Sequence, residues 1–217
     1  MSIRLTLAEI ESYLRKAARA TGLDWGIAEE AGKAARWLAA FGLPGPETML
    51  SHLQRLSGRE YRDFIPDCMQ DPWQARAELI CPIIAGAAIA DRSAQLLDGA
   101  SFRLGPTASP LLLAATIGQA ARRHRCVLTS AWAGVRVSCF ENGLSIEGRA
   151  DDLVCEQADA VVCTLGDAAT PEQLPSTLSY ALDDSIFAQI DALAFETYAP
   201  ATAESRAGAG AGLTDND

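Results

Sequence analysis

The sequence predicts an α+β protein, with helices in its N-terminal half and an antiparallel sheet of about four strands in its C-terminal half. Apolar residues recur at helical spacing as far as Leu56, and they alternate with polar residues in several short segments after Arg125. The run from Cys81 to Leu97 is apolar and rich in small residues, so we expect it to form a buried central helix.

A chain of 217 residues is long enough for one sizeable core, and we find no internal repeat, so we expect a single domain over residues 1–198. Within it we expect a helical lobe at 1–56, the central helix and sheet at 82–165, and a C-terminal helix at 183–197. Residues 199–217 form a glycine-rich acidic tail that lacks the apolar content to fold alone.

The helices of the first half have recognisable start signals. Thr6 followed by Glu9 is a capping box, which predicts a helix from Leu7 onward. Asp24 is expected to cap the second helix, where Glu29 and Lys33 have the spacing of an exposed ion pair. Small residues recur along this second helix, a pattern that favours close packing against another helix.

The central helix and the next one should each begin at a proline. Pro82 and Pro110 suit the first turn of a helix, because proline has no N–H to leave unpaired there. Gly99 offers a stop beyond Leu97. A short strand is plausible at 101–105 between these two helices.

The second half alternates in the manner of a sheet covered on one side. Asn142-Gly143 is a strong hairpin signal, and three strands of a meander surround it, at 126–132, 135–140 and 144–148. A fourth strand is expected at 159–165 and a surface linker at 166–180.

Charge and hydropathy exclude several classes of protein. The net charge of −10 and the lack of a basic stripe argue against nucleic acid as a partner. The one basic cluster, Arg122 to Arg125, is interpreted as a solvated helix end in preference to a phosphate site. The central run is too short for a membrane span, and the start has no apolar signal segment, so we expect a cytoplasmic protein with no membrane partner.

The six cysteines are scattered and include no Cys-x-x-Cys pair. In a reducing compartment we interpret them as buried thiols and not as three disulfides. With only two histidines, His52 and His124, the sequence has no zinc signature, and it names no cofactor.

Cys81 is the first catalytic candidate. If Pro82 is the first helical residue, the thiol lies at the N-cap, where free N–H groups and the helix dipole favour a nucleophilic thiolate. His52 or Asp91 would then assist it. The alternative is an inert thiol, because an apolar neighbourhood raises the pKa of a cysteine.

His52 is the second catalytic candidate, as an acid/base group. The segment Leu50 to Leu56, LSHLQRL, resembles the N-terminal segment of malate and lactate dehydrogenases that lack a Rossmann fold, where Ser-His-Gly carries the acid/base histidine. Leu53 replaces that glycine here, and the nicotinamide-binding body of that family has no counterpart. The alternative is a histidine with a structural or surface role.

The tail is a candidate binding segment. Gly208, Gly210 and Gly212 neither follow a strand nor open a helix, which rejects a dinucleotide site. They let the backbone lie close to another surface, and Ser205 and Arg206 precede them. We therefore consider a homo-oligomer or a protein partner bound through the tail, against the alternative of a frayed acidic end.

Three stretches together resemble a bacterial family, common in alphaproteobacteria, that carries only a domain-of-unknown-function label. They begin AARATGLDWG near Ala17, CPIIAGAAIADR at Cys81, and TYAPATAESR at Thr197. The resemblance implies a full-length bacterial unit and names no activity. Two functions remain open: a small-molecule enzyme or ligand-binding protein with a site between the helical lobe and the sheet, and a non-catalytic assembly protein that docks through its small-residue helices and tail.

Overall fold

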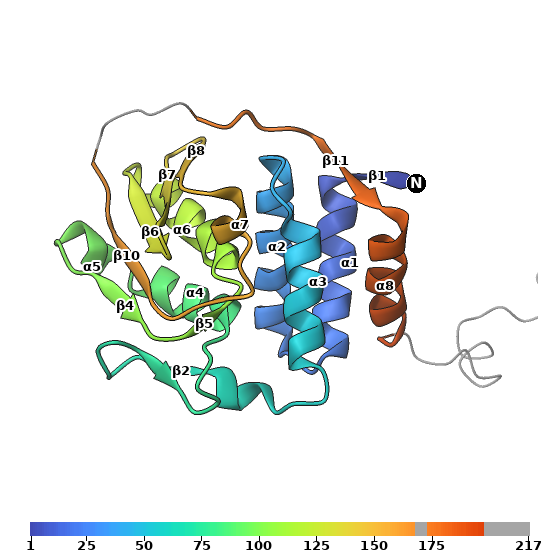
Figure 1. The fold of residues 1–217 in the computed structure, drawn as a ribbon, viewed down its shortest axis with the longest axis horizontal. Helices are drawn as coiled ribbons and strands as arrows, with labels where there is room; N and C mark the ends of the chain where they lie inside the picture. Colours follow the sequence, from blue (N-terminus) through green and yellow to red (C-terminus); the bar gives the residue numbers. More distant parts are fainter. Residues whose placement is uncertain (168–172, 198–217) are drawn as a thin grey trace, which may run out of the picture.

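The fold has a layer of helices on one side and a five-stranded sheet with its own helices on the other (Figure 1). It is seen in a computed structural model that describes residues 1–167 and 173–197. The mixed α+β class predicted from the sequence is confirmed.

The helical layer contains four helices that stand side by side in Figure 1. They are α1 (Leu7–Ala20), α2 (Trp25–Ala40), α3 (Gly45–Leu56) and α8 (Asp184–Phe195). The capping box predicted for α1 is present, since Glu9 N–H donates to Thr6 Oγ1 and Thr6 N–H donates to Glu9 Oε2. Asp24 is the N-cap residue of α2, but its carboxylate makes no cap bond and accepts instead from the Tyr61 hydroxyl.

The main sheet has the strand order β4-β10-β6-β7-β8, and every neighbouring pair is antiparallel. Its strands are β4 (Phe102–Leu104), β6 (Leu128–Trp132), β7 (Val135–Cys139), β8 (Leu144–Glu147) and β10 (Val161–Leu165). The expected meander and later strand are all present. The short strand near Phe102 completes the sheet as its fifth member, beside β10.

Three two-stranded pairings complete the fold. The first joins β1 (Ser2–Thr6) to β11 (Ser179–Asp183), so the two ends of the described chain meet beside α1 and α8. Strand β1 was not predicted from the sequence, and the beginning of β11 falls in the segment 166–180 that was predicted to be a surface linker. The others join β2 (Pro66–Asp67) to β3 (Gln74–Ala75), and β5 (Thr107–Ala108) to β9 (Gln157–Ala158).

The Pro82 helix is shorter than the sequence suggested. It is α4 (Pro82–Asp91), and the separate turn α5 (Ala94–Leu97) follows it. Pro82, Ile83, Ala85, Gly86 and Ile89 are buried, while its remaining residues are at least partly exposed. Further short helical segments are the 3-10 turn Tyr61–Phe64 and α7 (Ala150–Leu153).

Helix α6 (Leu111–His124) connects the two layers. All of Leu111–Gly118 is buried, and the helix packs against β6 and β7 on one side and against α2 and α4 on others. The Cys139 thiol donates to the Ala114 carbonyl oxygen at 3.5 Å, which ties β7 to this helix. Helix α6 is therefore more completely buried than the Pro82 helix that we expected to be central.

The close approach of α1 and α2 predicts the effect of one substitution. A Cβ at Gly32 would lie 2.6 Å from the Glu11 carbonyl oxygen, which is backbone and cannot rotate away. We expect Gly32→Ala to lower the free energy of unfolding by about 1–3 kcal/mol, measured by urea denaturation. Gly26→Ala is the control in the same helix, because a Cβ there meets nothing within 4 Å. Equal stability of the two variants would contradict this account of the helix contact.

Candidate functional site

The structure brings together the two catalytic candidates of the sequence analysis. His52 is on α3, within the stripe that buries Met49, Leu53 and Leu56 in the core. Cys81 is the N-cap residue of α4, as expected, and its Sγ lies 3.2 Å from His52 Nε2. Both side chains are fully buried.

Burial sets the protonation states of this pair. It lowers the pKa of His52 from 6.5 to about 3, and the nearby positive charge of Arg55 acts in the same direction. Burial raises the pKa of the Cys81 thiol from 9.0 to about 11, although the N–H groups of Ile83 and Ile84 oppose this rise. Near pH 7 both groups are neutral, so the contact is a hydrogen bond between neutral partners.

This geometry suits a polar contact inside the core better than a nucleophile. A reactive cysteine needs a thiolate and access to its substrate, and here the thiol is protonated and enclosed. Asp91, the other suggested helper, is exposed at the far end of α4, about 15 Å along the helix from Cys81. His52 Nδ1 has no hydrogen-bond partner in the described part of the chain.

The other sequence predictions concern the cysteines, metal ligands and the tail. The six cysteines are free thiols, three of them buried and three partly buried. Among residues 1–167 and 173–197, no group of three or more His, Cys, Asp or Glu side chains could hold a metal ion. The proposed tail residues lie outside the described residues, and their role stays a prediction: Ser205, Arg206, Gly208, Gly210 and Gly212.

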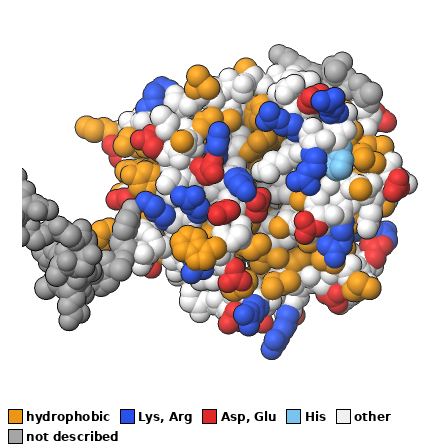
Figure 2. All heavy atoms as spheres, turned by 180° about the vertical axis from the view of Figure 1, so that it is seen from behind, with side chains coloured by type: hydrophobic (Ala, Val, Ile, Leu, Met, Phe, Trp, Pro, Cys, Tyr) orange, Lys and Arg blue, Asp and Glu red, His pale blue; other side chains and the backbone are white. Residues whose placement is uncertain are grey.

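A groove of about 510 Å³ lies elsewhere, between the helical layer and the sheet. Its walls come from α1, α2, α6 and the turn between β7 and β8, and Figure 2 shows this face, where charged side chains surround a hollow that contains hydrophobic ones. The residues that line it are Leu7, Glu11, Lys33, Arg36, Trp37, Ala40, Phe41, Gly118, Gln119, Arg122, Phe140, Glu141, Asn142, Gly143 and Ser176.

The apolar wall of the groove depends on Trp37. Its ring meets Phe41 edge to face, with centroids 4.9 Å apart and an interplanar angle of 62°. The indole also lies against Gly118 of α6, where a Cβ would come within 2.2 Å of Trp37 Cζ2. The absence of a side chain at Gly118 therefore lets the indole occupy this position.

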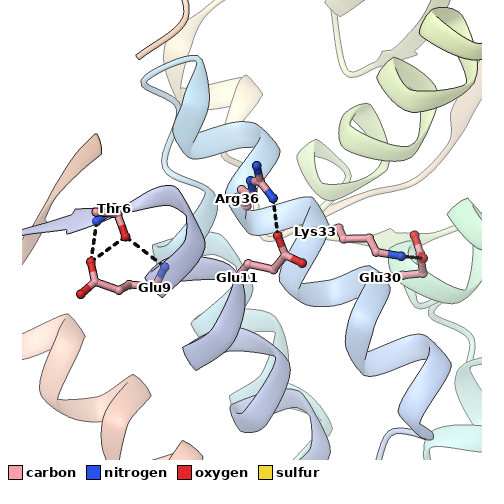
Figure 3. A network of polar contacts seen from close by, with 6 residues as sticks. All are labelled: Thr6, Glu9, Glu11, Glu30, Lys33 and Arg36. Carbon is pink, nitrogen blue, oxygen red and sulfur yellow. Dashed lines mark hydrogen bonds and ion pairs between the residues drawn. The ribbon is translucent and has the colours of Figure 1, made fainter. Parts of the chain in front are cut away.

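Two ion pairs lie along the helical side of the groove (Figure 3). Arg36 Nη1 of α2 lies 2.7 Å from Glu11 Oε2 of α1, so these two charges neutralise each other across the helix contact. Lys33 Nζ lies 2.8 Å from Glu30 Oε1, and this hydrogen bond is the main cause that raises the pKa of Lys33. Glu29 was the predicted partner of Lys33, but in the structure Lys33 pairs with Glu30.

The opposite side of the groove contains less constrained polar groups. Within the described residues, the Arg122 side chain has no hydrogen bond or ion pair with the protein. Glu141 reaches Arg125 at 3.9 Å, which is the outer limit of an ion pair. The amides of Gln119 and Asn142 complete this side.

The groove was not predicted from the sequence, because its residues come from separate segments of the chain. A partial signal existed on α2, where Lys33, Arg36, Trp37 and Ala40 follow helical spacing and mix charge with an aromatic ring. The basic cluster at the end of α6 does lie at a helix end as expected, but one member, Arg122, lines the groove.

Comparison with known proteins gives a family label without an activity. Residues 5–78 match the model of a family described as protein of unknown function (DUF3726), in agreement with the resemblance stated above. That match ends before α4. No curated protein matches the chain. Among the described residues, no helix is both long and apolar enough to cross a membrane.

The fold is shared with a solved structure. It is a crystal structure described as a dehydrogenase from Sinorhizobium meliloti, with a TM-score of 0.58 and 10% sequence identity. The alignment covers 89% of this chain and 100% of that one. At this identity the likeness concerns the arrangement of helices and strands alone.

The buried histidine predicts how stability depends on pH. Between pH 6.5 and about 3 the unfolded chain binds a proton at position 52 that the folded protein does not, so stability is lost as the pH falls through this range. One such proton contributes a slope of up to about 1.4 kcal/mol per pH unit. We expect His52→Gln to flatten the slope of the unfolding free energy between pH 5 and 6.5, measured by urea denaturation.

His124→Gln is the control, because it replaces the other histidine, whose Nε2 lies 2.9 Å from Ser93 Oγ in a partly buried position. The control should keep the slope of the native protein. An undiminished slope in His52→Gln would show that position 52 is not the group that takes up the proton.

Proposed function

We propose that this protein binds a small molecule in the groove between α2, α6 and the β7–β8 turn, as a cytoplasmic ligand-binding protein or small-molecule enzyme. The observation that carries the proposal is the groove itself. It combines a fixed aromatic wall with charged and amide side chains that converge from both layers, and its volume of about 510 Å³ is that of a small-molecule site.

The side chains that line the groove also support the proposal. Trp37 and Phe41 bring apolar surface to the groove, while Arg122, Gln119 and Asn142 bring groups able to fix the orientation of a ligand. The buried pair of His52 and Cys81 is outside this groove, so we assign it no part in binding.

The alternative of a non-catalytic assembly protein stays a prediction. It depends on the tail beyond Thr197, which lies outside the described residues. The crystal structure described as a dehydrogenase supports neither function for this chain, because at 10% sequence identity the likeness is one of fold alone.

A thermal-shift screen against a panel of metabolites tests the proposal. A ligand present at about 100 times its Kd stabilises the native state by about 2.7 kcal/mol, so a binder should raise Tm by several degrees. We expect that shift to disappear in Ala40→Trp, because Ala40 lines the groove and a larger side chain would fill it. Ala192→Trp is the matched control, on the exposed side of α8.

Two results would contradict the proposal. One is a ligand whose shift survives Ala40→Trp in a variant that remains folded, which would place binding elsewhere. The other is the lack of any stabilising compound in a broad panel.

A further inference from the structure

We infer that the ligand of this groove is an organic anion, with its charged group held by Arg122 and a flat apolar part packed against Trp37. The inference rests on the proposed function and specifies the chemical class of the ligand. It follows from which groups in the groove already have partners and which do not.

The charges that line the groove are unevenly engaged. Arg36 and Glu11 satisfy each other at 2.7 Å, and Lys33 is held by Glu30 at 2.8 Å. Arg122 has no partner among the described residues, although the protein as a whole carries a net charge of −10. A guanidinium that faces a groove without a carboxylate partner is a suitable site for an anion.

The neighbouring amides favour the same class of ligand. Gln119 is on α6, three residues before Arg122, and Asn142 is in the β7–β8 turn, so both can donate to the oxygens of a carboxylate or phosphate. A cationic ligand would have less to bind. Glu11 is paired with Arg36, and the positive charge of Arg125 lies 3.9 Å from Glu141, where it opposes the approach of a cation.

The aromatic wall defines the rest of the ligand. Trp37 lines the groove and contacts both Phe41 and α6 at Gly118, so it offers aromatic surface with little freedom to rearrange. Its indole N–H makes no hydrogen bond with the described part of the protein. A planar group can therefore pack here at low entropic cost and accept from the indole.

Three probes of similar size separate charge from ring. Benzoate and phenyl phosphate carry a ring and an anionic group, and they distinguish a carboxylate from a phosphate ligand, whereas benzamide keeps the ring without the charge. Binding is measured by titration in two-dimensional ¹⁵N NMR spectra at fixed ionic strength. We expect at least one anionic probe to bind more tightly than benzamide and to shift the Trp37 indole resonance, while Trp25, exposed at the start of the same helix, is unaffected.

The Arg122 variants test the assigned contact. Arg122→Gln should weaken binding of the anionic probe by about tenfold and leave benzamide unchanged, because one charge-assisted pair is lost. Arg122→Lys should keep part of the affinity. Arg123→Gln is the matched control, since it removes an adjacent exposed charge that does not line the groove. Arg122 is exposed, so its variants are expected to fold.

The outcomes distinguish this inference from the proposed function. If benzamide binds as tightly as the anions and Ala40→Trp abolishes benzamide binding, the groove binds small molecules. The inference that its ligand is an anion would then be wrong. If Arg122→Gln and Arg123→Gln weaken binding of the anionic probe equally, the attraction comes from general surface charge and not from Arg122. That result would also overturn the inference. Failure of both anions to bind at millimolar concentration overturns the inference, while the metabolite screen still decides the function.

Discussion

The contact between α2 and α6 is the constraint on which the rest of this structure depends. Helix α6 is buried from Leu111 to Gly118 because the sheet covers one side of it and α2 and α4 pack on others. The indole of Trp37 fits against α6 only because position 118 has no side chain. The same contact joins the helical layer to the sheet and forms the apolar wall of the groove, so the stability of the fold and the ligand site that we propose depend on the same residues.

Much of the fold follows from local sequence signals. The capping box of Thr6 and Glu9, the prolines at the starts of α4 and α6, and the Asn142-Gly143 turn each act within a few residues, and each occurs where expected. The pairing of β1 with β11 could not be read in this way. Ser2–Thr6 does alternate polar and apolar residues, but its partner lies more than 170 residues away, so no local pattern specifies it.

Which of α4 and α6 is more deeply buried could not be predicted from the sequence either. Both have a proline at their start, Pro82 as the first residue of α4 and Pro110 as the N-cap residue of α6, and both are strongly apolar there. Composition alone therefore does not say which one is enclosed on more sides. The difference arises from packing. Helix α6 lies against strands β6 and β7 as well as helices α2, α3 and α4, whereas the main contacts of α4 are with helices α6 and α2.

The candidate site was also predicted from the sequence only in part. His52 and Cys81 were both predicted as catalytic candidates, with His52 as one possible helper of Cys81. Burial, which a sequence shows poorly, makes them neutral partners in the core. The groove residues come from the first two helices, α6 and a hairpin turn, and none is unusual by itself. What distinguishes them is which charged side chains form ion pairs within the described residues and which remain free to bind a ligand. Only the folded chain shows these pairs.

Gly118→Ala tests the central contact most directly. The variant should be less stable than the native protein by about 1–3 kcal/mol in urea denaturation, and the NMR resonance of the Trp37 indole should move as the ring is displaced from α6. Native stability together with an unmoved Trp37 resonance would contradict the account, because it would show that α2 and α6 do not meet through this glycine.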